Sequence, residues 1–478
     1  MVPVFTSENS ITVALSDPSD LDTIDSLQHL LKKEQFEYRV ATEEQIEAAI
    51  NKYYGSSDDS VANMITHFTE GDIDLGFATE GDTFKDEEVD ADAPLIKLVN
   101  TIISDAFKTR ASDIHIEPME KRLRVRYRID GVLQEVNSPP KRLQGAIMSR
   151  LKIQSGMSIA ERRIPQDGRI QLMIGDKPID LRVNCMPTVH GESVCMRILD
   201  KSGIKLGLEQ LGFLTDDQQT FERLIALPDG ILLVTGPTGS GKTTTLYSCL
   251  NYINRPDRKI ITVEDPVEYQ LAGINQVQVA EAVGLTFAIA LRAMLRQAPN
   301  VVMLGEIRDM ETATIAINAS LTGHLVFSTL HTNDAPGAVT RLIDIGIKPF
   351  LVASATRAMM AQRLVRKICK KCAQPYTPTA AELKSLEIDP KTITGANFQK
   401  GAGCKDCKDG HRGRFGIFEI FVIDDHARKL IYERVPNSVL RARALEAGMR
   451  SLRDDGARKV INGMTTSEEV IRATVGDH

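Results

Sequence analysis

A glycine-rich loop with a lysine and three threonines lies in the middle of the chain. It follows the apolar stretch 231–235 and consists of Gly236, Pro237, Thr238, Gly239, Ser240, Gly241, Lys242, Thr243 and Thr244. Glycines let backbone N–H groups close around phosphates, Lys242 can reach β and γ oxygens, and the Thr243 hydroxyl can coordinate Mg²⁺. A helix predicted at 244–252 points its N-terminus at the same charge. The sequence therefore predicts an ATP site.

Two carboxylates lie just after further apolar stretches. Glu264 comes after 260–263, and Glu306 comes shortly after 301–304. Ligands of parallel α/β sheets bind at the carboxyl ends of the strands, so we expect both acids to face the phosphates. A phosphate-loop enzyme ordinarily carries Asp on the second strand for Mg²⁺, so Glu306 is assigned as the base. Glu264 is then the candidate for the Mg²⁺ hydration shell and Glu268 for a supporting role. A helix cap or a surface ion pair is the alternative for Asp265 and Glu268.

Two histidines bracket the apolar stretch 325–329. His324 precedes the stretch and His331 follows it closely. A single histidine is more often structural than functional. Two histidines at the ends of a strand expected to border the γ-phosphate favour a sensing or positioning role.

Arginines alternate with apolar residues between positions 122 and 129. The alternation places one set of side chains on a single face of a strand, namely Arg122, Arg124, Arg126 and Arg128. Two interpretations remain open. The arginines could pair across strands with Asp113 and Glu117, or they could form a basic face toward phosphate or a neighbouring subunit.

Four of the seven cysteines form two Cys-x-x-Cys pairs, Cys369 with Cys372 and Cys404 with Cys407. In a chain without a secretory signal, such pairs indicate metal rather than disulfides. Four thiolates suit a closed, structural Zn²⁺ site, which could contribute on the order of 10 kcal/mol to ordering 369–407. Four free cysteines are the alternative, and nearby lysines could indicate a nucleic-acid zinc module.

Length and composition indicate a cytoplasmic protein of several domains. The chain has 478 residues, 42% of them hydrophobic and 26% charged, with a net charge of −6. Its apolar runs are strand-sized, far shorter than a membrane span. The acidic balance and an aromatic content of 5% argue against nucleic acid as a partner.

The chain divides into five predicted segments. A small α/β module at 1–60 precedes an acidic linker at 61–92, in which residues 70–92 hold ten acids and one lysine. A sheet-rich domain at 93–200 and a short linker at 201–207 lead to segment 208–478. There, helices alternate with apolar strands typical of a buried parallel sheet. The cysteine pairs fall in an insertion at 366–410.

The motifs, taken in this order, resemble those of the extension ATPases of type II secretion systems and type IV pili. The likeness runs from about residue 11 to the C-terminus and includes segments 111–118, 162–169 and 187–192. It implies an α/β fold: a RecA-like phosphate-loop ATPase domain, a smaller sheet-rich, PAS-like domain, and the N-terminal module. It further implies a cytoplasmic homo-hexamer that uses ATP and Mg²⁺, holds Zn²⁺ and drives pilin or pseudopilin assembly. Such rings attach peripherally to the inner membrane through a platform protein and a cytoplasmic docking protein.

The resemblance also implies that each ATP site lies between the sheet-rich and ATPase domains. Arg182 and Arg197 match the family's arginine fingers, which can be worth about 10³–10⁵ in turnover. A structural salt bridge is the alternative for both arginines.

Two departures from the family pattern lead to further expectations. The chain starts after the point where some members carry a cyclic-di-GMP motif, so we expect no cyclic-di-GMP binding. The cysteine pairs distinguish the chain from retraction motors, which share the ATPase core. Two other functions stay open: a motor associated with nucleic acid or DNA uptake, and a scaffold that binds ATP without hydrolysing it.

Overall fold

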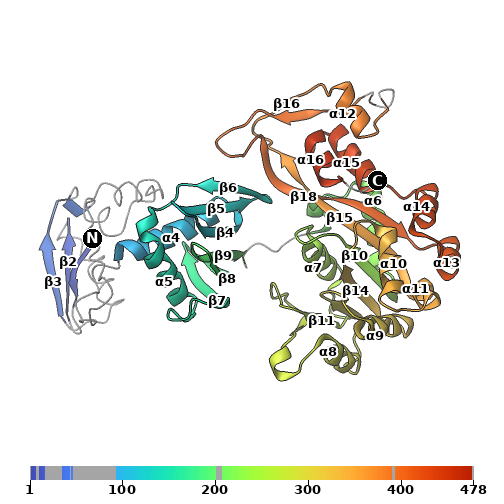
Figure 1. The fold of residues 1–478 in the computed structure, drawn as a ribbon, viewed down its shortest axis with the longest axis horizontal. Coiled ribbons are helices and arrows are strands. Elements are labelled where there is room, and N and C mark those ends of the chain that lie inside the picture. The colour runs from blue at the N-terminus through green and yellow to red at the C-terminus, as the bar shows by residue number, and fades with distance from the viewer. Residues whose placement is uncertain are drawn as a thin grey trace. The chain divides into compact units, whose positions relative to one another are not determined.

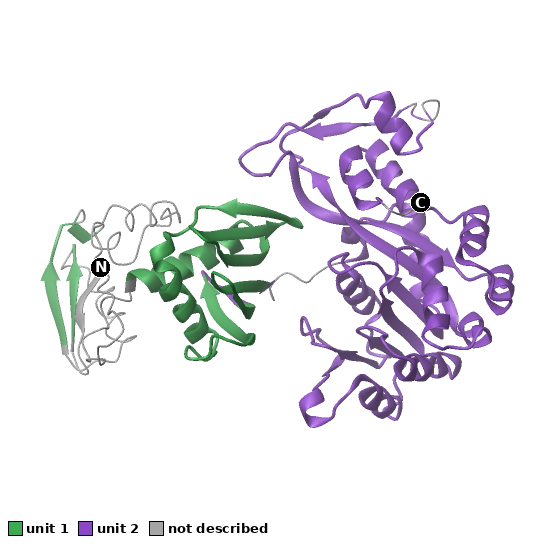
Figure 2. Cartoon of the chain, in the orientation of Figure 1, with its two compact units in different colours: residues 1–174, 180–198 green, residues 175–179, 199–478 purple. Residues whose placement is uncertain are grey.

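A computed structural model of the chain describes residues 2–6, 10–16, 35–42, 45–46, 93–200, 207–389, 393 and 395–475. The chain forms two compact units, one of residues 1–174 and 180–198 and the other of residues 175–179 and 199–478 (Figure 2). The predicted acidic linker at 61–92 lies outside the described residues. So does the predicted linker at 201–207, apart from its last residue.

Three strands near the N-terminus form a small sheet. They are β1 (Val2–Thr6), β2 (Ser10–Leu15) and β3 (Gln35–Val40). β2 lies in the middle, antiparallel to β1 and parallel to β3. Val13 and Leu15 of β2 are buried, which agrees with the apolar pattern of this stretch.

Residues 111–200 contain a six-stranded sheet. Its strands are β4 (Ala111–Pro118), β5 (Leu123–Ile129), β6 (Val132–Val136), β7 (Gln166–Ile174), β8 (Lys177–Thr188) and β9 (Gly191–Asp200), in the spatial order β6-β5-β4-β9-β8-β7. β4 pairs antiparallel with both β5 and β9. Two helices accompany the sheet, α4 (Ala93–Lys108) and α5 (Gln144–Gln154).

The two faces of strand β5 differ, as its alternation predicts. Leu123, Val125 and Tyr127 are buried, and the Tyr127 hydroxyl donates to the Ile102 carbonyl of α4 at 2.8 Å. The arginines therefore project from the face opposite α4. Six residues of α4 are buried at helical spacing: Leu95, Leu98, Val99, Ile102, Ile103 and Ala106.

The second unit is built on a seven-stranded sheet (Figure 1). In spatial order its strands are β12 (Asn275–Gln278), β11 (Ile260–Glu264), β13 (Val301–Leu304), β14 (Leu325–Leu330), β10 (Gly230–Thr235), β15 (Thr356–Ile368) and β18 (His411–Val422). All neighbours pair in parallel except β15 and β18. The parallel strands predicted from apolar runs are confirmed.

Helices cover both faces of this sheet. They are α6 (Thr215–Ile225), α7 (Lys242–Ile253), α8 (Phe287–Leu295), α9 (Met310–Leu321), α10 (Ala335–Asp344), α11 (Pro349–Ala355), α13 (Asp425–Tyr432), α14 (Asn437–Glu446), α15 (Leu452–Ile461) and α16 (Ser467–Ala473). Alternate residues of β10 enter two separate cores. Leu232 joins a core that α6 and α7 contribute to, and Leu233 joins one that includes α8, α9 and α10. Burial on both faces explains the uninterrupted apolar sequence of β10.

An insertion separates β15 from β18. Ile368 pairs with His411 at the ends of these two long strands, and the intervening chain forms β16 (Ala373–Pro375), α12 (Ala380–Ser385) and β17 (Gln399–Gly401). Leu383 and Leu386 pack with Val460 and Val470 of α15 and α16. The insertion therefore has a small apolar core shared with the C-terminal helices.

Candidate functional site

The phosphate loop lies between the end of β10 and the start of α7, as predicted. Gly236, Gly239 and Gly241 have φ angles of +145°, +79° and +92°, a region that favours glycine. A Cβ on Gly236 would lie 2.5 Å from the backbone oxygen of Gln362, on β15. The loop therefore requires glycine both for its backbone path and for its contact with β15.

Lys242 occupies the first turn of α7. Its ammonium group donates to the carbonyls of Gly236 and Pro237, at 2.8 and 3.1 Å. Burial lowers the pKa of Lys242, an effect that the carboxylate of Glu306 opposes. Thr243 is exposed, so its hydroxyl is open to an ion. The Lys242 ammonium group, which is predicted to bind the phosphates, is thus stabilised by the negative charge of Glu306, the predicted base.

Glu306 follows β13 and is held by groups from neighbouring segments. Its carboxylate lies 3.1 Å from Nε2 of His331, which follows β14, and it forms an ion pair with Arg308. The backbone around it is also fixed, because Gly305 N–H donates to Val263 of β11 and Ile307 N–H donates to Thr329 of β14. The carboxyl ends of adjacent strands therefore bring Glu306 and His331 together.

Glu264, the last residue of β11, is 3% exposed. The Thr262 hydroxyl donates to its carboxylate at 2.6 Å, Gln276 Nε2 donates at 3.1 Å, and the Tyr247 hydroxyl donates as well. Tyr247 belongs to α7, the helix that begins with Lys242. Glu264 therefore stands at the predicted edge of the sheet, bound tightly by protein donors. Its role toward Mg²⁺ stays a prediction.

His324 lies at the other end of β14. Its carbonyl accepts from the N–H of Gly230, the first residue of β10, and its Nδ1 lies 3.0 Å from the Ala319 carbonyl. The phosphate loop follows the opposite end of β10, about 20 Å away for a six-residue strand. Within one chain, the length of β14 therefore separates the two histidines, and the predicted sensing or positioning role of His324 stays a prediction.

The arginine face of β5 is engaged in ion pairs. Glu117 binds Arg124 at 2.9 Å and Arg126 at 2.7 Å, and Asp113 binds Arg128 at 3.2 Å. Arg122 pairs with Glu135 instead. Cross-strand pairing, one of the two open interpretations, thus accounts for these contacts.

The two candidate arginine fingers lie on β8 and β9. Arg197 Nε lies 3.1 Å from the Asp113 carboxylate, while its side chain remains 59% exposed. Arg182, on β8, is half-buried. Both belong to the first unit and the phosphate loop belongs to the second, so their part in completing an ATP site stays a prediction.

The four paired cysteines converge at the base of the insertion. Their sulfurs all lie within 4.8 Å of one another, with separations of 3.9 Å for Cys369–Cys404, 3.6 Å for Cys372–Cys407 and 3.5 Å for Cys404–Cys407. With Zn–S bonds of about 2.3 Å, the sulfurs of a regular tetrahedron lie about 3.8 Å apart. The observed separations therefore fit one Zn²⁺ ion held by four thiolates.

The sequence of this chain is similar to those of known protein families. Residues 88–472 match the model of the family described as type II/IV secretion system protein. The chain belongs to this family. Residues 1–60 of this secretion ATPase match the MshEN domain. Family membership confirms the predicted α/β fold with a RecA-like ATPase domain and the predicted class of enzyme, an ATPase.

Two relatives match this secretion ATPase over most of both chains. It is 47% identical to the type IV pilus assembly ATPase PilB of Myxococcus xanthus over 484 residues, covering 100% of the chain and 84% of PilB. It is 48% identical to the type II secretion system protein E of Pseudomonas aeruginosa over 434 residues, covering 90% and 86%. Neither relative supports the alternative of a nucleic-acid motor.

Solved structures share the fold. The pilus retraction motor PilT with bound ADP has a TM-score of 0.53 and 27% identity, and the likeness covers 78% of this chain and 95% of PilT. The ATPase DotB of Legionella pneumophila has a TM-score of 0.59 over 80% and 96% of the two chains. At 21% identity, DotB supports the fold alone.

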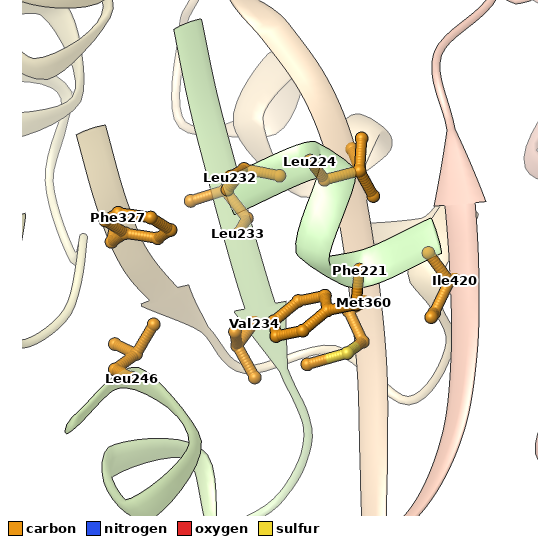
Figure 3. Close-up of a pocket in the computed structure, with 10 residues that line it drawn as sticks. Phe221, Leu224, Leu232, Leu233, Val234, Leu246, Phe327, Met360 and Ile420 are labelled. Carbon is orange, nitrogen blue, oxygen red and sulfur yellow. The ribbon is translucent and has the colours of Figure 1, made fainter. Parts of the chain in front are cut away.

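The core beside the phosphate-binding helix contains a small void. An apolar void of about 10 Å³ lies between β10, α6 and α7, where Phe221, Leu232, Val234, Leu246 and Met360 are among the lining residues (Figure 3). This is the lower limit for a single water molecule, and the void's apolar lining would not bind one. None of the described helices combines the length and apolar character needed to cross a bilayer.

Proposed function

We propose that this chain is the motor that powers assembly of a type II secretion pseudopilus or a type IV pilus. The observation that carries the proposal is its identity of 47–48% with PilB and protein E over most of both chains. An intact phosphate loop and a preassembled pair of Glu306 and His331 support it, because a motor of this family needs turnover as well as nucleotide binding.

The residues at the strand ends have two roles in hydrolysis: some bind the phosphates and Mg²⁺, and others transfer a proton. The loop N–H groups and Lys242 hold the β and γ phosphates, and Thr243 offers its hydroxyl to Mg²⁺. Bound Mg²⁺ supplies charge neutralisation for the phosphates. Glu306 positions the attacking water and takes its proton, while His331 orients the Glu306 carboxylate. Glu264 supports the hydration shell from β11.

The assembly part of the proposal is a homo-hexamer in the cytoplasm. The ring attaches to the inner membrane through a platform protein and a docking protein, as the family resemblance implies. Arg182 and Arg197 would complete the site of each subunit, so that turnover depends on the position of the first unit. No binding of nucleic acid is expected.

The zinc part of the proposal assigns Zn²⁺ to Cys369, Cys372, Cys404 and Cys407. The site is proposed as structural, because four protein thiolates leave no open coordination position. The ion would fasten the insertion to the ends of β15 and β18. It takes no part in hydrolysis.

Phosphate release by purified Lys242→Ala and Glu306→Gln variants tests the active site. Lys242→Ala should lose ATP binding, whereas Glu306→Gln should bind a fluorescent ATP analogue normally and turn over about 10²- to 10⁴-fold more slowly. Glu311→Gln is the matched control, because Glu311 is 58% exposed and pairs only with Arg292 among the described residues. Normal turnover by Glu306→Gln would refute the assignment of the base.

Cell experiments test the filament role. Host cells that lack the gene should lose surface pili or secretion, and the wild-type gene should restore them while the Glu306→Gln gene should not. Restoration by Glu306→Gln would separate hydrolysis from assembly and contradict the motor function.

A further inference from the structure

We propose that Tyr247 is a positioning residue for ATP hydrolysis, acting through its hydrogen bond to Glu264. This inference rests on the proposed role of the strand-end site, and Tyr247 lies outside the sequence motifs of that site. Tyr247 lies in the second turn of α7 and is 2% exposed.

The hydrogen bonds around Glu264 show which of its oxygens the Tyr247 hydroxyl binds. A carboxylate offers about four acceptor positions on its two oxygens. Thr262 and Gln276 both donate to Oε1, and the Tyr247 hydroxyl donates to Oε2. Tyr247 is therefore the donor that fixes the second oxygen, and with it the plane of the carboxylate.

The same hydroxyl also engages the segment after β11. It accepts a hydrogen bond from the Glu268 N–H at 3.3 Å. Burial raises the pKa of Tyr247, as does its bond to Glu264, so the hydroxyl keeps its proton at neutral pH. One protonated hydroxyl thus ties together the Glu264 side chain and the loop that carries Glu268.

The position of Tyr247 connects these groups to the phosphates. Lys242 and Thr243 stand one turn earlier on the same helix, whereas Glu264 lies on β11, beyond β14 and β13 in the sheet. The hydrogen bond therefore spans from the phosphate-binding helix to an acid three strands away from β10. Any shift of α7 when the loop binds nucleotide moves the donor that orients Glu264.

Packing is the competing explanation for Tyr247. Its ring lies edge-on to Tyr269, with centroids 6.2 Å apart, and it belongs to the core beneath α7. Substitution by phenylalanine keeps the ring and removes only the hydroxyl, so it separates packing from positioning.

The test compares Tyr247→Phe with wild type in the full-length protein. We expect kcat to fall about 10- to 100-fold, the range for losing a hydrogen bond to a charged group. Binding of a fluorescent ATP analogue in EDTA should stay unchanged, because the phosphate loop is intact. The control is Tyr252→Phe on the same helix, where the tyrosine is 46% exposed, and kcat should equal that of wild type.

A double-mutant cycle with Glu264→Gln identifies the route of the effect. If Tyr247 acts through the Glu264 carboxylate, adding Tyr247→Phe to Glu264→Gln should change the single-turnover rate by less than about twofold. Full additivity, or a wild-type kcat in Tyr247→Phe, would overturn the proposal. Equal hydrolysis by wild type and Lys242→Ala would instead refute the proposed active site, so the two failures are distinguishable.

Discussion

Replacing Cys407 by serine should weaken zinc binding and loosen the base of the insertion without unfolding the ATPase core. The sulfur separations of 3.5–3.9 Å fit one ion with the four thiolates as its ligands. Structural Zn²⁺ sites contribute roughly 10–16 kcal/mol at pH 7. One ligand of four is then worth roughly 3 kcal/mol, which is about a 100-fold change in affinity.

The structural response should be local. Leu383, Leu386 and Ile388 form an apolar cluster with residues of α15 and α16 that does not depend on the metal. Hydrogen exchange should therefore rise in the two cysteine turns, 369–372 and 404–407, more than in α12. The sheet strands β10 and β14 should keep wild-type protection because their cores lie elsewhere.

Zinc content and competition with a chelator measure the affinity. Wild type should hold one zinc per chain, and Cys407→Ser should release it at about 100-fold less chelator. Cys195→Ser is the control, because Cys195 lies on β9 outside the cluster. Two results would refute the reasoning: an absence of zinc in wild-type protein purified under reducing conditions, or equal retention by wild type and Cys407→Ser.

Two further predictions concern stability. Lys459 and Asp455 form a pair 0% and 2% exposed, so Lys459→Met should cost about 3–5 kcal/mol in chemical denaturation by leaving a buried carboxylate unpaired. Adding Asp455→Asn should recover part of that loss, and an unchanged midpoint in Lys459→Met would contradict the argument. Burial raises the pKa of Glu117, but hydrogen bonds from Arg126 and Arg124 outweigh burial, so the net shift is downward. The ion pairs of Glu117 therefore stabilise the folded state above the unfolded-state pKa of about 4.3, and this stabilisation is lost as the pH falls further. Wild type should be more stable than Glu117→Gln at pH 7, and the difference should shrink below about pH 4, whereas a constant difference would rule out this titration.

Particular residues show how far the sequence could predict the site. The loop from Gly236 to Thr244 and the position of Glu306 followed from local patterns, because a glycine loop after an apolar run and an acid at a strand end have few alternative meanings. The position of His324 follows from the same order, because a residue that precedes a strand of a parallel sheet lies at the edge opposite the carboxyl ends.

Tyr247 shows the converse case. Its sequence neighbours Leu246 and Ser248 are buried with it in α7, and a tyrosine in a buried helix ordinarily has a packing role. Only the crossing of α7 toward β11 brings its hydroxyl to Glu264. Long-range contacts of this kind depend on the order of strands, which apolar runs alone leave undetermined.

The sequence by itself determined the chemistry of this protein: a phosphate loop, strand-end acids and two cysteine pairs, each set by residue types at short spacing. Only the tertiary structure decided which of these groups meet. It joined Glu306 to His331 and closed two cysteine pairs separated by 31 residues into one cluster. The physical reason is that spacing along the chain fixes local geometry, whereas contacts between distant segments follow from how strands pair and which faces they bury.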